Sequence, residues 1–141
     1  MRRCFAIALL GGIATLAVPT VASACTCAVV PEKQRYREAD AAFVGRLDSV
    51  RMLAGEEYGA AIFRFRVGRN YKRKLREFVK VRSNTQGPTC GLPQHEGRYA
   101  LYLYREDGRW RSNLCLQTTP RKLRRAARGQ SSGSATGCPA A

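Results

Sequence analysis

The sequence predicts an all-β protein with one short helix, folded as a five-stranded OB-type Greek-key barrel that disulfides staple together. Five short segments have the residue pattern of strands and are separated by turn residues. One helical segment precedes them, and cysteines are spread across the patterned region. Five short strands in a small domain favour a barrel, because closure hides strand edges that would otherwise pair with other chains.

Residues 1–24 have the layout of a secretory signal peptide. Two arginines precede an apolar run over residues 5–18, and small residues then form a cleavage site after Ala24. The apolar run is shorter than the roughly 20 residues that a membrane-spanning helix needs. We therefore expect a secreted or periplasmic protein whose mature chain begins at Cys25.

Residues 25–119 are expected to form one domain, because chains of this size usually share a single core. Residues 31–40 begin with proline and continue with good helix formers, which predicts one short helix. Residues 41–50 follow as the first strand. Gly45 within it indicates a bulge or a tight bend.

The other four strands are predicted from alternation and turn signals. Residues 60–67 place Phe63 and Phe65 on one face and arginines on the other. The hairpin signal Glu106-Asp107-Gly108 separates the last two strands. The remaining predicted strands cover residues 78–82, 99–104 and 110–116.

Residues 120–141 differ from the domain in composition. A basic, alanine-containing run over residues 121–128 is followed by a stretch rich in Gly, Ser and Ala, which predicts a disordered tail. The formal net charge of the whole chain is +15. Such a surface attracts polyanions or acidic proteins, although net charge alone names no partner.

Six cysteines are present, and Cys4 would leave with the signal peptide. Small exported domains often need disulfides for stability. An even number of cysteines inside the domain predicts two bridges, and the fifth mature cysteine, Cys138, is left as a spare thiol. The four domain cysteines are Cys25, Cys27, Cys90 and Cys115.

The order and spacing of these motifs resemble the netrin-like module, most closely the N-terminal domain of the tissue inhibitors of metalloproteinases, in a single-domain form. The likeness covers residues 25 to about 119 and rests on Cys25-Thr26-Cys27, Phe43-Val44-Gly45, Cys90-Gly91 and Cys115. In that family the first cysteine is the first mature residue. The resemblance implies bridges from Cys25 to Cys90 and from Cys27 to Cys115. The family helix carries a further cysteine, where this chain has Arg35-Tyr36-Arg37.

The resemblance also implies inhibition of zinc metalloendopeptidases. A catalytic zinc keeps one coordination position for water, and the free amine and carbonyl oxygen of Cys25 would displace that water. Thr26 would enter the pocket for the substrate residue after the scissile bond. The only metal would be the zinc of the target protease, and the protein would need no cofactor of its own. The implied inhibitory contact comprises Cys25, Thr26, Cys27, Ala28, Val29, Thr89 and Cys90.

Three alternatives stay open at this point. The disulfides would also suit a non-inhibitory basic netrin-like or OB module that binds anionic glycans or surfaces. The sequence before Cys25 weakly resembles a bacterial lipobox, and an acylated Cys25 would be unable to chelate zinc. OB barrels can bind nucleic acid through aromatic and basic residues, but export argues against a genomic target.

An enzyme is not expected. The sequence offers no paired carboxylates at a plausible site, no phosphate-binding loop and only one histidine, His95. A metal or redox site at the paired cysteines is also disfavoured, because export favours oxidation to disulfides.

Overall fold

The computed structural model describes residues 25–55, 59–85 and 90–131. The predicted signal peptide, Thr89 and Cys138 therefore lie outside the described residues. Neither of the α-helices in the described segments has the length and apolar character needed to cross a bilayer. The elements in chain order are α1 (Glu32–Glu38), β1 (Ala41–Met52), β2 (Ala60–Lys72), β3 (Phe78–Asn84), β4 (Arg98–Glu106), β5 (Arg109–Arg111), the 3-10 helix η1 (Leu114–Leu116), β6 (Gln117–Thr118) and α2 (Pro120–Ser131).

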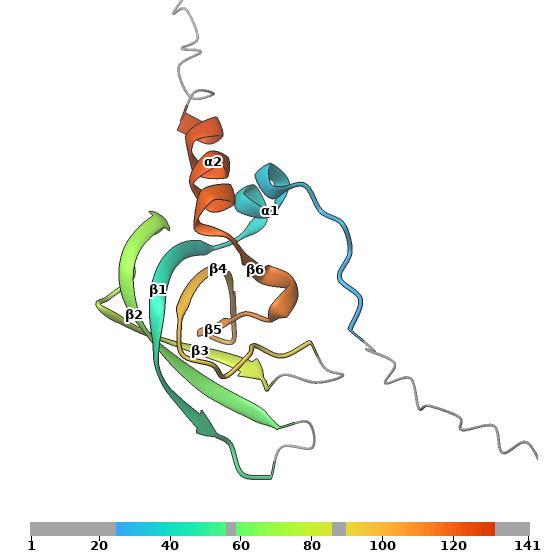
Figure 1. The fold of residues 1–141 in the computed structure, drawn as a ribbon, viewed down its shortest axis with the longest axis vertical. Helices are drawn as coiled ribbons and strands as arrows, with labels where there is room; N and C mark the ends of the chain where they lie inside the picture. The colour runs from blue at the N-terminus through green and yellow to red at the C-terminus, as the bar shows by residue number, and fades with distance from the viewer. Residues whose placement is uncertain (1–24, 56–58, 86–89, 132–141) are drawn as a thin grey trace, which may run out of the picture.

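Five strands close into a barrel (Figure 1). Strand β1 pairs antiparallel with both β2 and β4, and β2 pairs antiparallel with β3. A short parallel pairing between β3 and β5 and an antiparallel pairing between β5 and β4 complete the ring. Strand β6 adds to β4 beside the barrel. This arrangement confirms the predicted disulfide-stapled, OB-like barrel.

Alternation along the strands builds the barrel core. In β2, the rings of Phe63 and Phe65 are fully buried, whereas the side chain of Arg66 is exposed to solvent. Phe65 makes edge contacts with Phe43 of β1 and Tyr99 of β4, with ring centroids 5.6 and 5.3 Å apart. The predicted inward and outward faces of this strand are confirmed.

Gly45 marks a register shift between β1 and β2, as the sequence predicts. A Cβ atom at this position would lie 2.5 Å from the carbonyl oxygen of Arg66. Only glycine fits there without a backbone shift, which lets β1 bend and pair with strands on both sides.

The last predicted strand was too long. Strand β5 ends at Arg111, and the chain then turns into η1 instead of continuing to residue 116. The Asn113 side chain accepts a hydrogen bond from the Leu116 backbone N–H and so stabilises this turn. The Ser112 hydroxyl donates to the Tyr102 carbonyl oxygen, which fixes the point where the chain leaves the barrel.

The prediction of disorder was wrong for residues 120–131, which form α2 and pack against α1. Leu123 and Ala126 are one turn apart and buried together with Tyr36 of α1. The basic residues lie on the exposed face of the helix. The density of basic residues led to the prediction of disorder, but Leu123 and Ala126 lie at helical spacing and dock this short helix against the rest of the protein.

Glu32 connects α1 to the barrel. One carboxylate oxygen accepts a hydrogen bond from the Tyr102 hydroxyl at 2.7 Å, and the other accepts one from the Thr118 hydroxyl at 2.7 Å. Burial, followed by this bond to Glu32, raises the pKa of Tyr102 far above its ordinary value, so the hydroxyl remains a proton donor. The carboxylate of Glu32 thus connects α1 to both β4 of the barrel and β6.

Replacing Glu32 by alanine is expected to lower the free energy of unfolding by about 1–3 kcal/mol, because the buried Tyr102 hydroxyl would lose its partner. Chemical denaturation measures the change. The matched control is Glu38→Ala in the same helix, which removes an exposed bond to Gln34 and should cost less than about 0.5 kcal/mol. Equal effects of the two substitutions would show that the Glu32 contacts carry no special stability.

Candidate functional site

The segment before α1 runs in an extended conformation along the outside of the barrel (Figure 1). Two disulfides fasten it. Cys25 is bonded to Cys90 across 65 residues of sequence, with the Cα atoms 5.2 Å apart. Cys27 is bonded to Cys115 across 88 residues, with the Cα atoms 5.3 Å apart. Both pairings that the resemblance implies are present.

Cys90 is held on a closely packed part of the barrel. Its carbonyl oxygen accepts a hydrogen bond from the Leu114 N–H at 2.8 Å. A Cβ atom on Gly91 would lie 2.2 Å from the carbonyl oxygen of Asn84, so only glycine allows this approach to the end of β3. The N–H of Leu92 donates to the same Asn84 oxygen at 3.0 Å. Cys90, the disulfide partner of Cys25, is therefore held in place by the barrel.

Tyr99 holds the loop that follows. Its hydroxyl lies 2.7 Å from the carbonyl oxygen of His95 and 3.0 Å from that of Pro93, within donating distance of both. Burial raises the pKa of Tyr99 above its ordinary value, which keeps the proton available. The His95 ring is exposed and stacks beside Tyr99.

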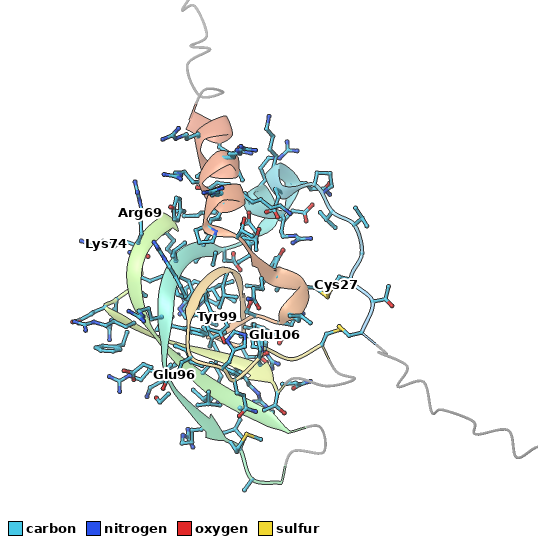
Figure 2. All side chains as sticks on the ribbon, viewed as in Figure 1. Cys27, Arg69, Lys74, Glu96, Tyr99 and Glu106 are labelled. Atoms are coloured by element: carbon cyan, nitrogen blue, oxygen red, sulfur yellow. A yellow bond between two sulfur atoms is a disulfide. The ribbon has the colours of Figure 1, made fainter. Side chains whose placement is uncertain are left out.

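The residues after Cys25 face solvent. Thr26, Cys27 and Ala28 are exposed, and Val29 is 101% exposed, while Cys25 itself is partly exposed. Figure 2 shows Cys27 on this segment, with the sulfur bridges reaching toward the barrel. We call Cys25, Thr26, Cys27, Ala28, Val29 and Cys90 the N-terminal edge. It combines a backbone fixed at two points with side chains that are free to contact a partner.

The sulfur atoms of Cys25, Cys27 and Cys115 lie within 4.8 Å of one another. Metal ions bind thiolates, but these sulfurs are all consumed in disulfides. The cluster therefore acts as a double cross-link at the N-terminal edge. Its main-chain atoms, rather than its sulfurs, are what this edge can offer to a metal.

Helix α1 contains no cysteine, and other contacts anchor it. Tyr36 is buried, and its hydroxyl donates to the Tyr71 carbonyl oxygen at 2.6 Å. Helix α2 packs against the same helix. The anchoring role of Tyr36 was not predicted, because the residue was considered only as standing where the similar proteins have a cysteine. An aromatic residue among charged ones in a short amphipathic helix was the signal that indicates such a role.

Of the predicted contact residues, the structure brings six together, and Thr89 lies outside the described residues. No protein-family model matches this chain, and no curated protein matches its sequence. The fixed N-terminal edge and the positive charge of the barrel surface are the features of this chain that bear on its function.

Proposed function

We propose that this protein inhibits zinc metalloendopeptidases by placing the main-chain terminus of Cys25 on the catalytic zinc of the target. The observation that supports this most is the bridge from Cys25 to Cys90, which fixes the first residue of the expected mature chain beside exposed residues. The proposal requires removal of residues 1–24, because only then does Cys25 carry a free amine.

The amine nitrogen and carbonyl oxygen of one residue can bind a metal together in a small chelate ring. A catalytic zinc uses its open position to activate water. Both donor atoms of Cys25 would take up that part of the coordination sphere, and the protease would lose its nucleophile. The Cys25–Thr26 peptide bond would then lie at the zinc, but it would stay intact because the water that attacks a substrate has been displaced.

Residues after Cys25 would follow the path of a substrate. Thr26 would fill the pocket for the residue after the scissile bond, and Ala28 and Val29 would continue along the groove. The exposure of these side chains supports this role. A free peptide would have to be ordered on binding, whereas bridges at Cys25 and Cys27 remove much of that entropic cost beforehand.

Inhibition should depend on pH through the terminal amine. An α-amino group ordinarily has a pKa of about 7.7–8.0 and must lose its proton to bind a metal. Protons therefore compete with zinc below this range, and affinity should fall by up to about tenfold per pH unit as the pH decreases. Inhibition constants measured from about pH 6 to about pH 9 test this, with a non-titrating active-site inhibitor as reference. A profile identical to the reference would contradict amine coordination.

Mass spectrometry of the native N-terminus tests the premise separately. A measured mass that matches a chain beginning at unmodified Cys25 supports the proposal. A retained signal peptide, a different cleavage site or an acylated Cys25 would each contradict it.

The second candidate is a non-inhibitory module that binds anionic glycans or surfaces. The formal charge of the whole chain is +15, of which the predicted signal peptide contributes only Arg2 and Arg3, and this basic character favours it. Inhibition that needs a free amine distinguishes the first function, whereas salt-sensitive retention on heparin without any inhibition would favour the second.

A further inference from the structure

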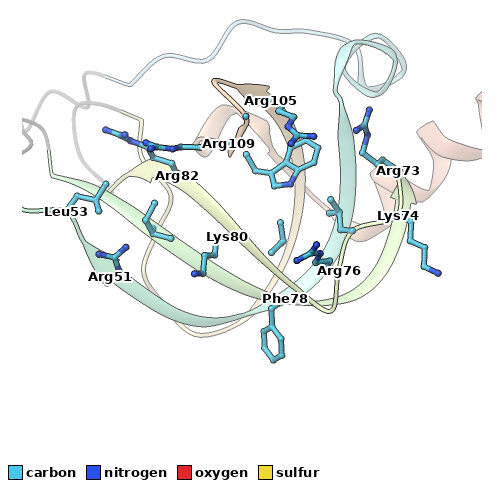
Figure 3. A pocket seen from close by; sticks show the side chains of 15 residues that line it. Arg51, Leu53, Arg73, Lys74, Arg76, Phe78, Lys80, Arg82, Arg105 and Arg109 are labelled. Atoms are coloured by element: carbon cyan, nitrogen blue, oxygen red, sulfur yellow. The ribbon is translucent and has the colours of Figure 1, made fainter.

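A basic groove lies on the barrel wall formed by β3, the loop after β2 and the β4–β5 hairpin (Figure 3). Its volume is about 840 Å³. Among the residues that the structure describes, fifteen line the groove; eight of these are arginine or lysine, and none is aspartate or glutamate. A second pocket is lined in part by Cys27, Ala28 and Val29 of the N-terminal edge, and it shares no lining residue with the groove.

Strand alternation places part of this charge. Val79 and Val81 of β3 point into the core, so Lys80 between them points out into the groove. Arg73, Lys74 and Arg76 come from the loop between β2 and β3. In Figure 3, Arg73, Lys74 and Arg76 lie toward one end of the groove, and Arg109 lies beside Arg82 toward the other end.

Aromatic rings hold some of the guanidinium groups. Arg73 and Arg105 both lie over the Trp110 ring, 5.9 and 5.4 Å from its centroid. Arg64 covers the Phe78 ring at 4.0 Å. Contacts of this kind orient the planar guanidinium group without neutralising it. Two cations around one indole leave a concentrated positive charge at this end of the groove.

The carboxylates near the groove that the structure describes are engaged elsewhere. Ion pairs join Asp48 to Arg64, Glu77 to Arg66 and Glu106 to Arg111, and these arginines do not line the groove. Asp107 occupies the tip of the hairpin and is likewise not a lining residue. Among the described residues, these ion pairs leave Arg76, Lys80 and Arg109 without a carboxylate partner, so these three cations can act together on a ligand.

We infer that this basic groove binds an extended sulfated glycan. Arginine forks match the oxygen geometry of sulfate and carboxylate groups, and a row of cations on a concave wall suits a chain of repeated anions. The strands 2–3 face of OB barrels with its flanking loops also accommodates oligosaccharides. The two disulfides point to an oxidising compartment.

Nucleic acid fits this groove less well. Binding of single strands depends on aromatic faces that are open for base stacking. Here, arginine side chains already cover Trp110 and Phe78, and Tyr99 and Tyr102 are buried in the core. The groove offers charge rather than stacking platforms.

The test compares two triple variants of the mature protein with equal loss of charge. The groove variant is Arg76→Gln, Lys80→Gln and Arg109→Gln, all at exposed positions. The control, on α2, is Arg121→Gln, Arg124→Gln and Arg125→Gln, also exposed. Heparin affinity is measured by titration at several salt concentrations, with a single-stranded oligonucleotide of matched charge as competitor.

The groove variant should bind heparin at least about 30-fold more weakly at physiological salt, and the slope of log affinity against log salt should decrease by about three. The control variant should change less than about threefold. Equal losses in both variants, or a larger loss in the control, would overturn the assignment. Displacement of heparin by the oligonucleotide at equal or lower concentration would assign the groove to nucleic acid instead. Protease inhibition, measured in parallel, should be the same in all three proteins, so the two proposals can fail separately.

Discussion

A protein that retains Ala24 ahead of Cys25 is expected to lose inhibition of zinc proteases by more than about 100-fold, equivalent to over about 2.7 kcal/mol of binding free energy. The extra residue converts the Cys25 amine into an amide, which has no lone pair available for a metal. It also adds bulk where the zinc would lie. Acetylation of the Cys25 amine should have the same effect for the same reasons. Inhibition constants of the extended, acetylated and native forms measure it.

The matched control carries the additional alanine after Ala141, far along the sequence from the N-terminal edge. It should inhibit like the native protein, and all forms should unfold at the same denaturant concentration. If the form that retains Ala24 inhibits within about threefold of the native protein, the terminus of Cys25 does not bind the zinc.

Removal of the bridge between Cys27 and Cys115 by alanine substitution at both positions should lower the free energy of unfolding by about 4 kcal/mol. The bridge closes a loop of 88 residues, and the entropy that it removes from the unfolded chain grows with loop length. The N-terminal edge would also be fixed at one point only, so inhibition should weaken along with stability. Denaturant unfolding and an inhibition titration measure the two effects.

Cys138→Ser is the control, because the two disulfides already pair the four cysteines of the domain. It should leave both stability and inhibition unchanged. A double variant that unfolds like the native protein would contradict the structural role of the bridge. A stable double variant with undiminished inhibition would show that fixing the edge adds nothing to affinity.

The barrel could be predicted because apolar and polar residues alternate regularly along its strands. Phe63 and Phe65 between arginines define both faces of β2, and Gly45 identifies the bend in β1 before any pairing is known. The end of β5 could not be predicted, since the side-chain cap at Asn113 competes locally with strand continuation. Helix α2 was missed because its stability comes from packing on α1 rather than from its own composition.

The N-terminal edge was predictable from the spacing of cysteines and from the resemblance that this spacing carries. The basic groove was not, because its cations come from the β2–β3 loop, β3 and the β4–β5 hairpin. Only the closed barrel brings Arg73 and Arg105 to the same indole ring. Glu32 was missed for the same reason: its partners, Tyr102 and Thr118, are 70 and 86 residues away in the sequence.

A titration of the protein that begins at Cys25 against a panel of zinc endopeptidases tests the central claim most directly, with the N-terminal mass confirmed beforehand. Inhibition of at least one protease at a ratio of one to one, relieved when a small zinc-binding inhibitor already occupies its active site, is the predicted result. Full activity of every protease in the presence of excess protein with a verified free amine would contradict it.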